Sequence, residues 1–295
     1  MRAPVKISTI TSLYNRVQSI MSSENPLQNI FPEHLKKINR KKTREVKVGD
    51  LVIGGGSPVV VQEMTSTYTA DIDKTVRQIR ELEEFGCKLI RVAVPDADSA
   101  RAVRHIREQV SIPVVVDIHF DYRLALLAIE SGADKLRINP GNIGGARKVA
   151  IVVAAAKERG IPIRVGVNSG SLEKAFMKKY GRITSQGMVE SALGQVSLLE
   201  KHGFYDIVIS LKSPDIHLTV EANKIISSQV DFPLHIGITE SGFGEEGKVR
   251  SAVGLSTLLL QGIGDTVRVS FTEQDRRENL SLCYHVLDGL SIPYV

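Results

Sequence analysis

The chain has 295 residues, of which 42% are hydrophobic and 24% charged, a composition that suits one large α/β domain with a buried core. Its formal net charge of +5 is small and mostly dispersed, which suits an anionic ligand but gives no argument for nucleic-acid binding. The two distant cysteines exclude a disulfide framework and a C-x-x-C metal motif, and no apolar run reaches transmembrane length, so we expect a cytoplasmic protein without membrane contact.

Residues 1–43 show no regular pattern and end in a basic cluster, which predicts a partly mobile N-terminal extension with solvated charges. The stretch Arg44–Ile53 (REVKVGDLVI) alternates between polar and apolar residues around a Gly-Asp turn, which predicts a β-hairpin. Such a hairpin is suited to plugging the N-terminal end of a barrel. We expect residues 44–295 to form one barrel domain.

From Pro58 onward, strand-like and helix-like runs alternate, with Gly or Pro at most junctions. The predicted strands are Val59–Gln62, Lys88–Val92, Val114–Ile118, Lys135–Ile138, Ile163–Val167, Asp206–Leu211, Leu234–Ile238 and Thr266–Val269. The predicted helices are Asp71–Phe85, Ala97–Gln109, Tyr122–Ser131, Ala146–Arg159, Gln186–His202, Ile216–Ser228, Lys248–Gln261 and Gln274–Gly289. This repeat predicts an α/β fold, a (β/α)8 TIM barrel, with a doubly wound open sheet as the alternative.

One G-x-G-x-x-G match, Gly242–Gly247, follows the seventh predicted strand. A lone match is weak, and the next strand ends in Arg268 and Ser270 with no acid for a ribose. We therefore do not expect a dinucleotide site.

The predicted strands turn polar toward their C-terminal ends, where a barrel forms its ligand face. Period 2 places these residues on one face of each strand. The pairs and triplets that share a face are Asp117 and His119, Arg137 and Asn139, Arg164, Gly166 and Asn168, Ser210 and Lys212, and Arg268 and Ser270, and Arg91 lies near the end of the second strand. If these faces point inward, several cations converge on one cavity.

Converging cations repel one another and lose hydration, so they need a counter-anion that Asp117 alone does not supply. A ligand with two or more negative charges, such as a diphosphate, would balance them, and the planar fork of Arg binds two phosphate oxygens at once. The alternative for any single Arg is a salt bridge at the barrel rim.

Two further residues are candidate catalytic groups. Glu240, after the seventh strand, could be a general acid, a partner of a pocket arginine or a member of a rim ion pair. His119 could donate a proton, bind the ligand, line the pocket or be structural. His235 receives no role.

Several long motifs occur in one family's order and spacing: VQEMTSTYTADID, RVAVPD, VVDIHFDYRLAL, KLRINPGNIG, IRVGVNSGSLEK, SLKSPD, LHIGITESG and SAVGLSTLLLQGIGDTVRVSFT. From about Arg40 to Leu290 the chain resembles the barrel domain of the 4-hydroxy-3-methylbut-2-enyl diphosphate synthase family (IspG, also called GcpE). The resemblance implies an oxidoreductase of the methylerythritol phosphate pathway of isoprenoid biosynthesis. Its reaction is the reductive ring opening and dehydration of 2-C-methyl-D-erythritol 2,4-cyclodiphosphate.

The resemblance also assigns residues to the site. It implies that the diphosphate is bound by Arg91, Arg137, Arg164, Lys212, Arg268 and Ser270, with Asn168 and His119 beside it and Glu240 near the reacting part of the substrate. Glu63 is a departure, because the family usually has a small residue there.

A larger departure concerns the cofactor. The family carries a C-terminal domain with a [4Fe-4S] cluster held by three cysteines and a glutamate, and neither of its cysteine motifs is present in this sequence, where Cys87 and Cys283 fit no ligand position. We expect no metal ligands in this chain, which could be a fragment, a split-gene product or an inactive barrel. The resemblance implies a homodimer or a separate cluster-domain chain, and flavodoxin or ferredoxin as electron donor. The alternatives are a non-redox diphosphate-binding barrel and a pterin-synthase-like barrel.

Overall fold

The computed structural model describes residues 38–139, 143–271 and 275–295. Residues 40–295 form one compact unit, and the other unit, residues 1–39, lies almost wholly outside the described residues, as does most of the extension predicted over residues 1–43. Within the described part of the chain, no helix is both long and apolar enough to cross a membrane.

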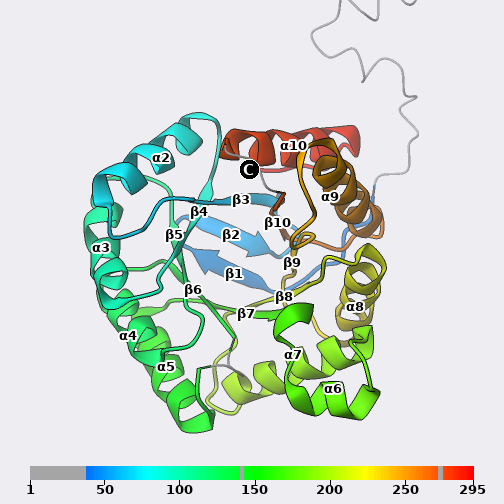
Figure 1. The fold of residues 1–295 in the computed structure, drawn as a ribbon, viewed down its shortest axis with the longest axis horizontal. Helices are drawn as coiled ribbons and strands as arrows, with labels where there is room; N and C mark the ends of the chain where they lie inside the picture. Colours follow the sequence, from blue (N-terminus) through cyan, green and yellow to red (C-terminus); the bar gives the residue numbers. More distant parts are fainter. Residues whose placement is uncertain (1–37, 140–142, 272–274) are drawn as a thin grey trace, which may run out of the picture. The chain divides into compact units, whose positions relative to one another are not determined.

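Eight parallel strands form a barrel, as the sequence predicted (Figure 1). In chain order they are β3 (Val60–Met64), β4 (Leu89–Ala93), β5 (Val114–Asp117), β6 (Lys135–Ile138), β7 (Ile163–Asn168), β8 (Ile207–Lys212), β9 (His235–Ile236) and β10 (Thr266–Val267). Neighbours in the chain pair in parallel, β10 pairs with both β9 and β3, and a bridge between Ile209 and Leu234 closes the ring. The open-sheet alternative is therefore wrong.

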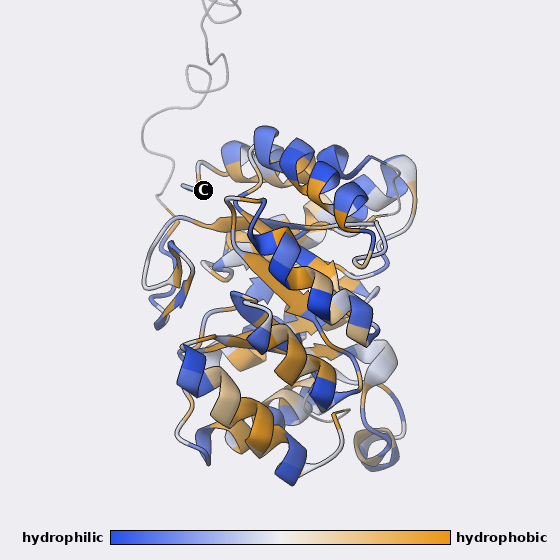
Figure 2. Cartoon of the chain, turned by 90° about the vertical axis from the view of Figure 1, so that its left-hand side faces the viewer, coloured by the Kyte–Doolittle hydropathy of each residue, from blue (hydrophilic) through white to orange (hydrophobic). Residues whose placement is uncertain are grey.

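Helices surround the strands, with hydrophilic residues outward and the hydrophobic strands inside (Figures 1 and 2). They are α2 (Ile72–Glu84), α3 (Ala97–Arg107), α4 (Tyr122–Glu130), α5 (Ala146–Arg159), α6 (Lys174–Tyr180), α7 (Ser185–Glu200), α8 (Ile216–Gln229), α9 (Gly244–Leu259) and α10 (Arg276–Gly289), with a 3₁₀ turn at Ser169–Ser171.

Two of these elements differ from the sequence prediction. Helix α9 begins at Gly244, four residues before the predicted start, because Glu245 and Glu246 occupy its first turn, where negative charge favours a helix. Helix α6 was not predicted, since none of its residues is buried and it has no apolar stripe to read. It is held instead by Glu190, which accepts hydrogen bonds from Lys179 (2.6 Å) and Tyr180 (2.7 Å).

Aspartates begin five of the helices. Each accepts a hydrogen bond from a backbone N–H of the first turn, which satisfies a donor that the helix itself leaves unpaired. The capping residues are Asp71, Asp96, Asp121, Asp215 and Asp275. Helices of a parallel barrel start where the strands end, so these acids stand around the ligand face with their carboxylates committed to helix N-termini.

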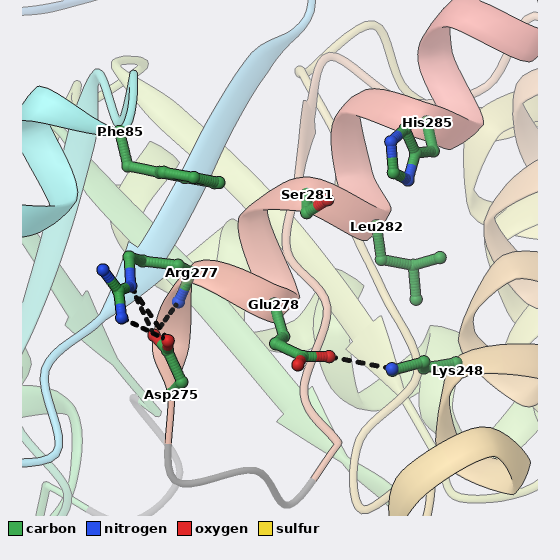
Figure 3. A pocket seen from close by; sticks show the side chains of 8 residues that line it. All are labelled: Phe85, Lys248, Asp275, Arg277, Glu278, Ser281, Leu282 and His285. Atoms are coloured by element: carbon green, nitrogen blue, oxygen red, sulfur yellow. Dashed lines mark hydrogen bonds and ion pairs between the residues drawn. The ribbon is translucent and has the colours of Figure 1, made fainter.

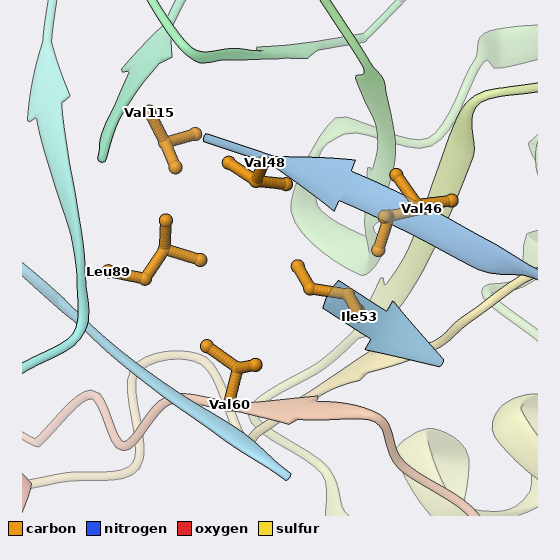
Figure 4. Close-up of a cluster of buried hydrophobic side chains, with 7 residues drawn as sticks. Val46, Val48, Ile53, Val60, Leu89 and Val115 are labelled. Carbon is orange, nitrogen blue, oxygen red and sulfur yellow. The ribbon is translucent and has the colours of Figure 1, made fainter. Parts of the chain in front are cut away.

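The predicted hairpin forms from β1 (Glu45–Val48) and β2 (Leu51–Gly54), and it lies across the centre of the ring in Figure 1. Val46, Val48 and Ile53 pack against residues from the N-terminal halves of four barrel strands (Figure 4). Those barrel residues are Val60, Leu89, Val115 and Val208. The hairpin therefore seals the bottom of the barrel with apolar side chains.

The segment before the hairpin is also attached to the barrel. The Arg40 guanidinium donates to the carbonyl of Ser57 (2.6 Å) and lies 3.5 Å from Asp265, while Lys41 donates to the carbonyls of Ser227 and Val230. The prediction that the charges of this basic cluster are solvated is wrong for these two residues, because each finds acceptors at the ends of barrel elements.

We expect Ile53→Ala to lower the free energy of unfolding by about 2–4 kcal/mol, because the side chain is fully buried between hairpin and barrel and its removal leaves a cavity. Urea denaturation of the purified chain measures this. Lys47→Ala, at an exposed position of the same hairpin, is the control and should change stability by less than about 0.5 kcal/mol. Equal losses of unfolding free energy in the two variants would contradict the role of the hairpin as an apolar plug.

Candidate functional site

A pocket of about 220 Å³ opens at the C-terminal ends of the barrel strands. Eight of the nine predicted site residues line it: Arg91, His119, Arg137, Arg164, Asn168, Lys212, Arg268 and Ser270. Met64, Ala93, Asp117, Ser210 and Thr239 complete the lining. Strand ends far apart in the sequence meet here because the barrel brings every strand's C-terminal end to one face.

Asp117 is the central anion of this pocket. Its carboxylate lies 3.2 Å from Arg91, 3.1 Å from Arg137 and 3.0 Å from His119 Nε2. Burial alone would raise the pKa of Asp117, but Arg91, the His119 hydrogen bond and Arg137 outweigh it and hold the pKa well below its usual range. Asp117 is therefore ionised, and it fixes two arginines and one histidine.

Two pocket cations have no such partner. Among the described residues, no carboxylate lies within ion-pair distance of Arg164 or Lys212, which are 2% and 7% exposed. Burial, followed by the charges of neighbouring arginines, lowers the pKa of both groups well below the usual value. Arg164 Nε and Nη1 also have no hydrogen-bond acceptor within the described chain. An anionic ligand would relieve this repulsion and supply the missing acceptors.

Two inward-facing glycines make room for these cations. A Cβ atom on Gly166 would lie 2.7 Å from Arg137 Nε, and one on Gly237 would lie 2.2 Å from the backbone oxygen of Arg268 and 2.9 Å from Lys212 Nζ. All three distances are too short for real contacts. The glycines therefore let the long side chains cross the barrel interior, a use of glycine that close approach requires.

Glu63 is the second buried anion near the pocket. Its Oε1 lies 3.4 Å from Arg268 Nε and accepts the backbone N–H of Met64 at 2.8 Å. Burial raises the pKa of Glu63, and Arg268 opposes that shift. The residue that departs from the family pattern is thus a counter-ion of a pocket arginine. Sequence period alone could not show this, because Glu63 alternates with the inward residues of its strand.

The two candidate proton donors occupy different places. His119 lines the pocket with its side chain 57% exposed, and Phe120 packs edge-on against its ring. Glu240 is exposed and does not line the pocket, although the preceding Thr239 does. Its backbone φ of +50° is unusual for a residue other than glycine, and among the described residues only Ser291 shares this conformation. The catalytic role of either residue stays a prediction.

Three buried polar residues beside this pocket were not predicted as site residues. Lys135, Gln62 and His235 are fully buried, and each belongs to the inward face of its strand. Lys135 is two positions before Arg137, so the same period-2 rule that found Arg137 could have found it.

A larger hollow of about 480 Å³ lies outside the barrel between Phe85 and helices α9 and α10 (Figure 3). Its charged residues are already paired, Lys248 with Glu278 at 2.8 Å and Arg277 with Asp275 at 2.6 Å. Because its four charged side chains pair with one another within the described chain, we take the smaller cationic pocket as the functional site.

The described residues do not form a metal centre. No group of three or more His, Cys, Asp or Glu side chains within residues 38–139, 143–271 and 275–295 could hold a metal ion. Cys87 and Cys283 are buried and free, and burial raises the pKa of both thiols to about 12. Neither thiol belongs to a group of described residues that could hold a metal ion.

Comparison with known proteins gives a specific match. Residues 43–284 match the protein family described as GcpE TIM-barrel domain. The chain is 61% identical over 233 residues to 4-hydroxy-3-methylbut-2-en-1-yl diphosphate synthase (flavodoxin) of Caldanaerobacter subterraneus subsp. tengcongensis, which covers 79% of this chain and 66% of that protein. It is 52% identical over 255 residues to the protein of the same name from Symbiobacterium thermophilum, a match that covers 86% of this chain and 69% of that protein. The chain thus spans about two thirds of the length of these curated relatives.

Solved structures give a more distant likeness. Dihydropteroate synthase of Yersinia pestis superposes with a TM-score of 0.59 at 12% identity, covering 84% of this chain and 98% of that chain. At this identity the likeness shows the barrel fold alone.

We expect Asp117→Asn to lower the free energy of unfolding by about 3–5 kcal/mol, because it leaves Arg91 and Arg137 buried without their carboxylate. The folded pKa of Asp117 is depressed, so its contribution is complete above the unfolded value near 3.9 and is lost as pH falls through the folded value. Urea unfolding from pH 3 to 8 should therefore show a constant gap between wild type and variant above about pH 5. If this difference in unfolding free energy already disappears near pH 6, Asp117 is not ionised in the folded chain at neutral pH with a depressed pKa.

Proposed function

Because the chain belongs to the GcpE TIM-barrel family, we propose that it is the substrate-binding barrel of a 4-hydroxy-3-methylbut-2-enyl diphosphate synthase. Its substrate on this proposal is 2-C-methyl-D-erythritol 2,4-cyclodiphosphate, which the enzyme opens reductively with loss of water. The single observation that carries the proposal is the excess of buried positive charge at the ligand face.

The charges in the barrel call for a multiply charged anion. Five cationic side chains line the pocket, and only two carboxylates, those of Asp117 and Glu63, lie within ion-pair distance of any of them among the described residues. The cations are Arg91, Arg137, Arg164, Lys212 and Arg268. A cyclic diphosphate carries two negative charges and several acceptor oxygens, which suits guanidinium groups held in fixed positions.

The same charges would assist the reaction itself. Ring opening breaks a C–O bond, and the electron pair stays on the phosphate oxygen, so the diphosphate gains one negative charge. Unpaired cations such as Arg164 and Lys212 stabilise this developing charge more than they stabilise the cyclic substrate. Interactions that strengthen toward the transition state are the ones that raise the rate.

The remaining polar residues would complete the site. Asn168 and Ser270 line the pocket and can donate hydrogen bonds to phosphate or sugar oxygens. On this proposal His119, which is hydrogen-bonded to Asp117, would donate a proton to the hydroxyl that leaves as water. Glu240 would approach the reacting end of the substrate from the rim.

The reduction needs two electrons, which the family takes from a [4Fe-4S] cluster. The described residues do not fit such a cluster, since the two cysteines are buried apart from any metal-binding group. We therefore assign binding and proton transfer to the residues of this sequence and propose that the cluster is held by cysteines that this sequence does not contain. A homodimer, a flavodoxin or ferredoxin donor and a cytoplasmic location belong to this proposal.

Calorimetric titration of the purified chain with the cyclodiphosphate tests the binding role. We expect binding without turnover, and reductase activity only after a cluster-bearing domain of the family is added. Binding with no rescue by any cluster domain would favour a non-redox diphosphate-binding barrel. Preference for a pterin diphosphate would favour a pterin-synthase-like barrel and overturn the proposal.

Arg164→Met should have opposite effects on binding and stability. It removes a phosphate ligand, so pyrophosphate binding weakens by about 1.5–3 kcal/mol, the scale of a charged hydrogen bond. It also removes a buried charge that has no carboxylate partner among the described residues, so the ligand-free chain becomes more stable by about 1–3 kcal/mol.

Calorimetry and urea unfolding measure the two effects. Arg159→Met, at an exposed position of α5, is the matched control and should leave both unchanged. If Arg164→Met binds pyrophosphate as tightly as wild type, Arg164 is not a phosphate ligand.

A further inference from the structure

The barrel interior is built in three levels. At the bottom, the hairpin and the first residues of the strands form an apolar plug. At the top is the cationic pocket. Between them lies a buried polar level made of Gln62, Lys135, His235 and Thr266, all with no exposed surface. Lys135 stands on β6 two residues, or about 6.6 Å, before Arg137 and on the same face.

The polar groups of this middle level are largely unpartnered within the described chain. Lys135 Nζ, both amide atoms of Gln62 and His235 Nε2 are buried without a hydrogen-bond partner, and His235 Nδ1 has only Thr266 Oγ1 at 3.4 Å. A buried ammonium without acceptors is among the most costly groups a protein can hold. Nothing in the mechanism above uses it, so its place in the barrel needs another explanation.

The surroundings of Lys135 are almost entirely cationic. The charged or titratable groups that face the interior from the other strands are Arg91, Asp117, Arg164, Lys212, His235 and Arg268, with Arg137 on its own strand. Asp117 is already bonded to Arg91, Arg137 and His119. Burial, then the charges of Arg164 and Arg91, lower the pKa of Lys135 well below the usual lysine value. The plug below offers no polar atom, because its side chains are valine, leucine and isoleucine.

We propose that Lys135 is neutral while the pocket is empty and takes up a proton from solvent when a multiply charged phosphate ligand binds above it. This inference rests on the proposed function, since it needs an anion in the pocket. The ligand's negative charge reverses the local field, so the ammonium form becomes the favoured one. Proton and ligand then bind together, and each increases the affinity for the other by the same factor.

Such a device has a functional consequence for the proposed reaction. The empty barrel carries one buried charge fewer, which lowers the repulsion that the fold must withstand. The bound barrel carries one more, at the stage when the diphosphate gains negative charge. Lys135 thus attracts the ligand electrostatically from the level below Arg137 and Arg164, without contacting it.

The experiment compares wild type, Lys135→Met and the exposed-lysine control Lys88→Met. Pyrophosphate is titrated by calorimetry at several pH values in buffers of different ionisation enthalpy, which gives the number of protons taken up. Wild type and Lys88→Met should take up a further fraction of a proton that Lys135→Met does not. Pyrophosphate and Lys212 titrate in all three chains, so the difference in proton uptake between Lys88→Met and Lys135→Met measures Lys135 together with the groups coupled to it.

Affinity supplies a second measurement. We expect Lys135→Met to bind pyrophosphate about tenfold more weakly near neutral pH, the effect of one buried charge at a distance of two residues. The difference should shrink toward none as pH rises past the lysine's titration in the complex. Equal proton uptake by wild type and Lys135→Met would overturn the proposal.

A ligand-free measurement separates this inference from the proposed function. In the chain labelled with carbon-13 at lysine Cε, the resonance that Lys135→Met removes should titrate well below the usual lysine value near 10.4 when the pocket is empty. It should move upward on saturation with pyrophosphate. A chain that binds no pyrophosphate contradicts the diphosphate pocket itself, whereas a resonance that stays fully charged in the empty chain at pH 9 overturns the role of Lys135 whatever the binding result.

Discussion

The carboxylate of Asp117 contacts Arg91, Arg137 and His119 at once, and the organisation of the ligand face depends on this one buried anion. Without it, the two arginines would repel each other and the imidazole would have no fixed direction. With it, they form a rigid wall on β4, β5 and β6, while Arg164 and Lys212 on the next two strands keep their charges uncompensated. The empty barrel therefore has an imbalance of charge, an excess of positive over negative groups, which a ligand of negative charge removes.

The rest of the fold makes that imbalance tolerable. The apolar plug of Val46, Val48 and Ile53 closes the opposite end of the barrel, so the interior keeps a low dielectric in which charge interactions are strong. Gly166 and Gly237 leave the space that the long cationic side chains occupy. Glu63 anchors Arg268 from behind the strand. The unpaired cations lower the stability of the empty barrel and strengthen the binding of an anion, as expected of a site whose charges are fixed in position before the ligand binds.

Much of this could be predicted from the sequence. Apolar runs with polar ends locate all eight strands, and period 2 correctly places Arg137 of β6 and Arg164 of β7 on the inward faces of their strands. Periodicity could not find α6, which has no buried face, or the start of α9, which contains two glycines. It did not single out Lys135, since a lysine at the start of a strand reads as an ordinary boundary residue until the closed barrel buries it. The contact of Glu63 with Arg268 depends on the closure between β3 and β10, which no local pattern encodes.

The aspartates that cap the helices at the ligand face bear on how an anion reaches this site. Acidic residues around a pocket mouth would ordinarily repel a phosphate, but these carboxylates are bonded to backbone N–H groups and, at Asp121 and Asp275, to neighbouring arginines. Asp71, Asp121 and Asp275 each pair with a neighbouring cation, which largely cancels their negative potential at a distance, and the positive end of the helix dipole partly offsets the other capping carboxylates. An approaching anion is therefore attracted mainly by the cations of the pocket. Association with an anionic ligand should then be fast and should slow strongly as salt is added, because the capping aspartates contribute little negative potential at the pocket entrance.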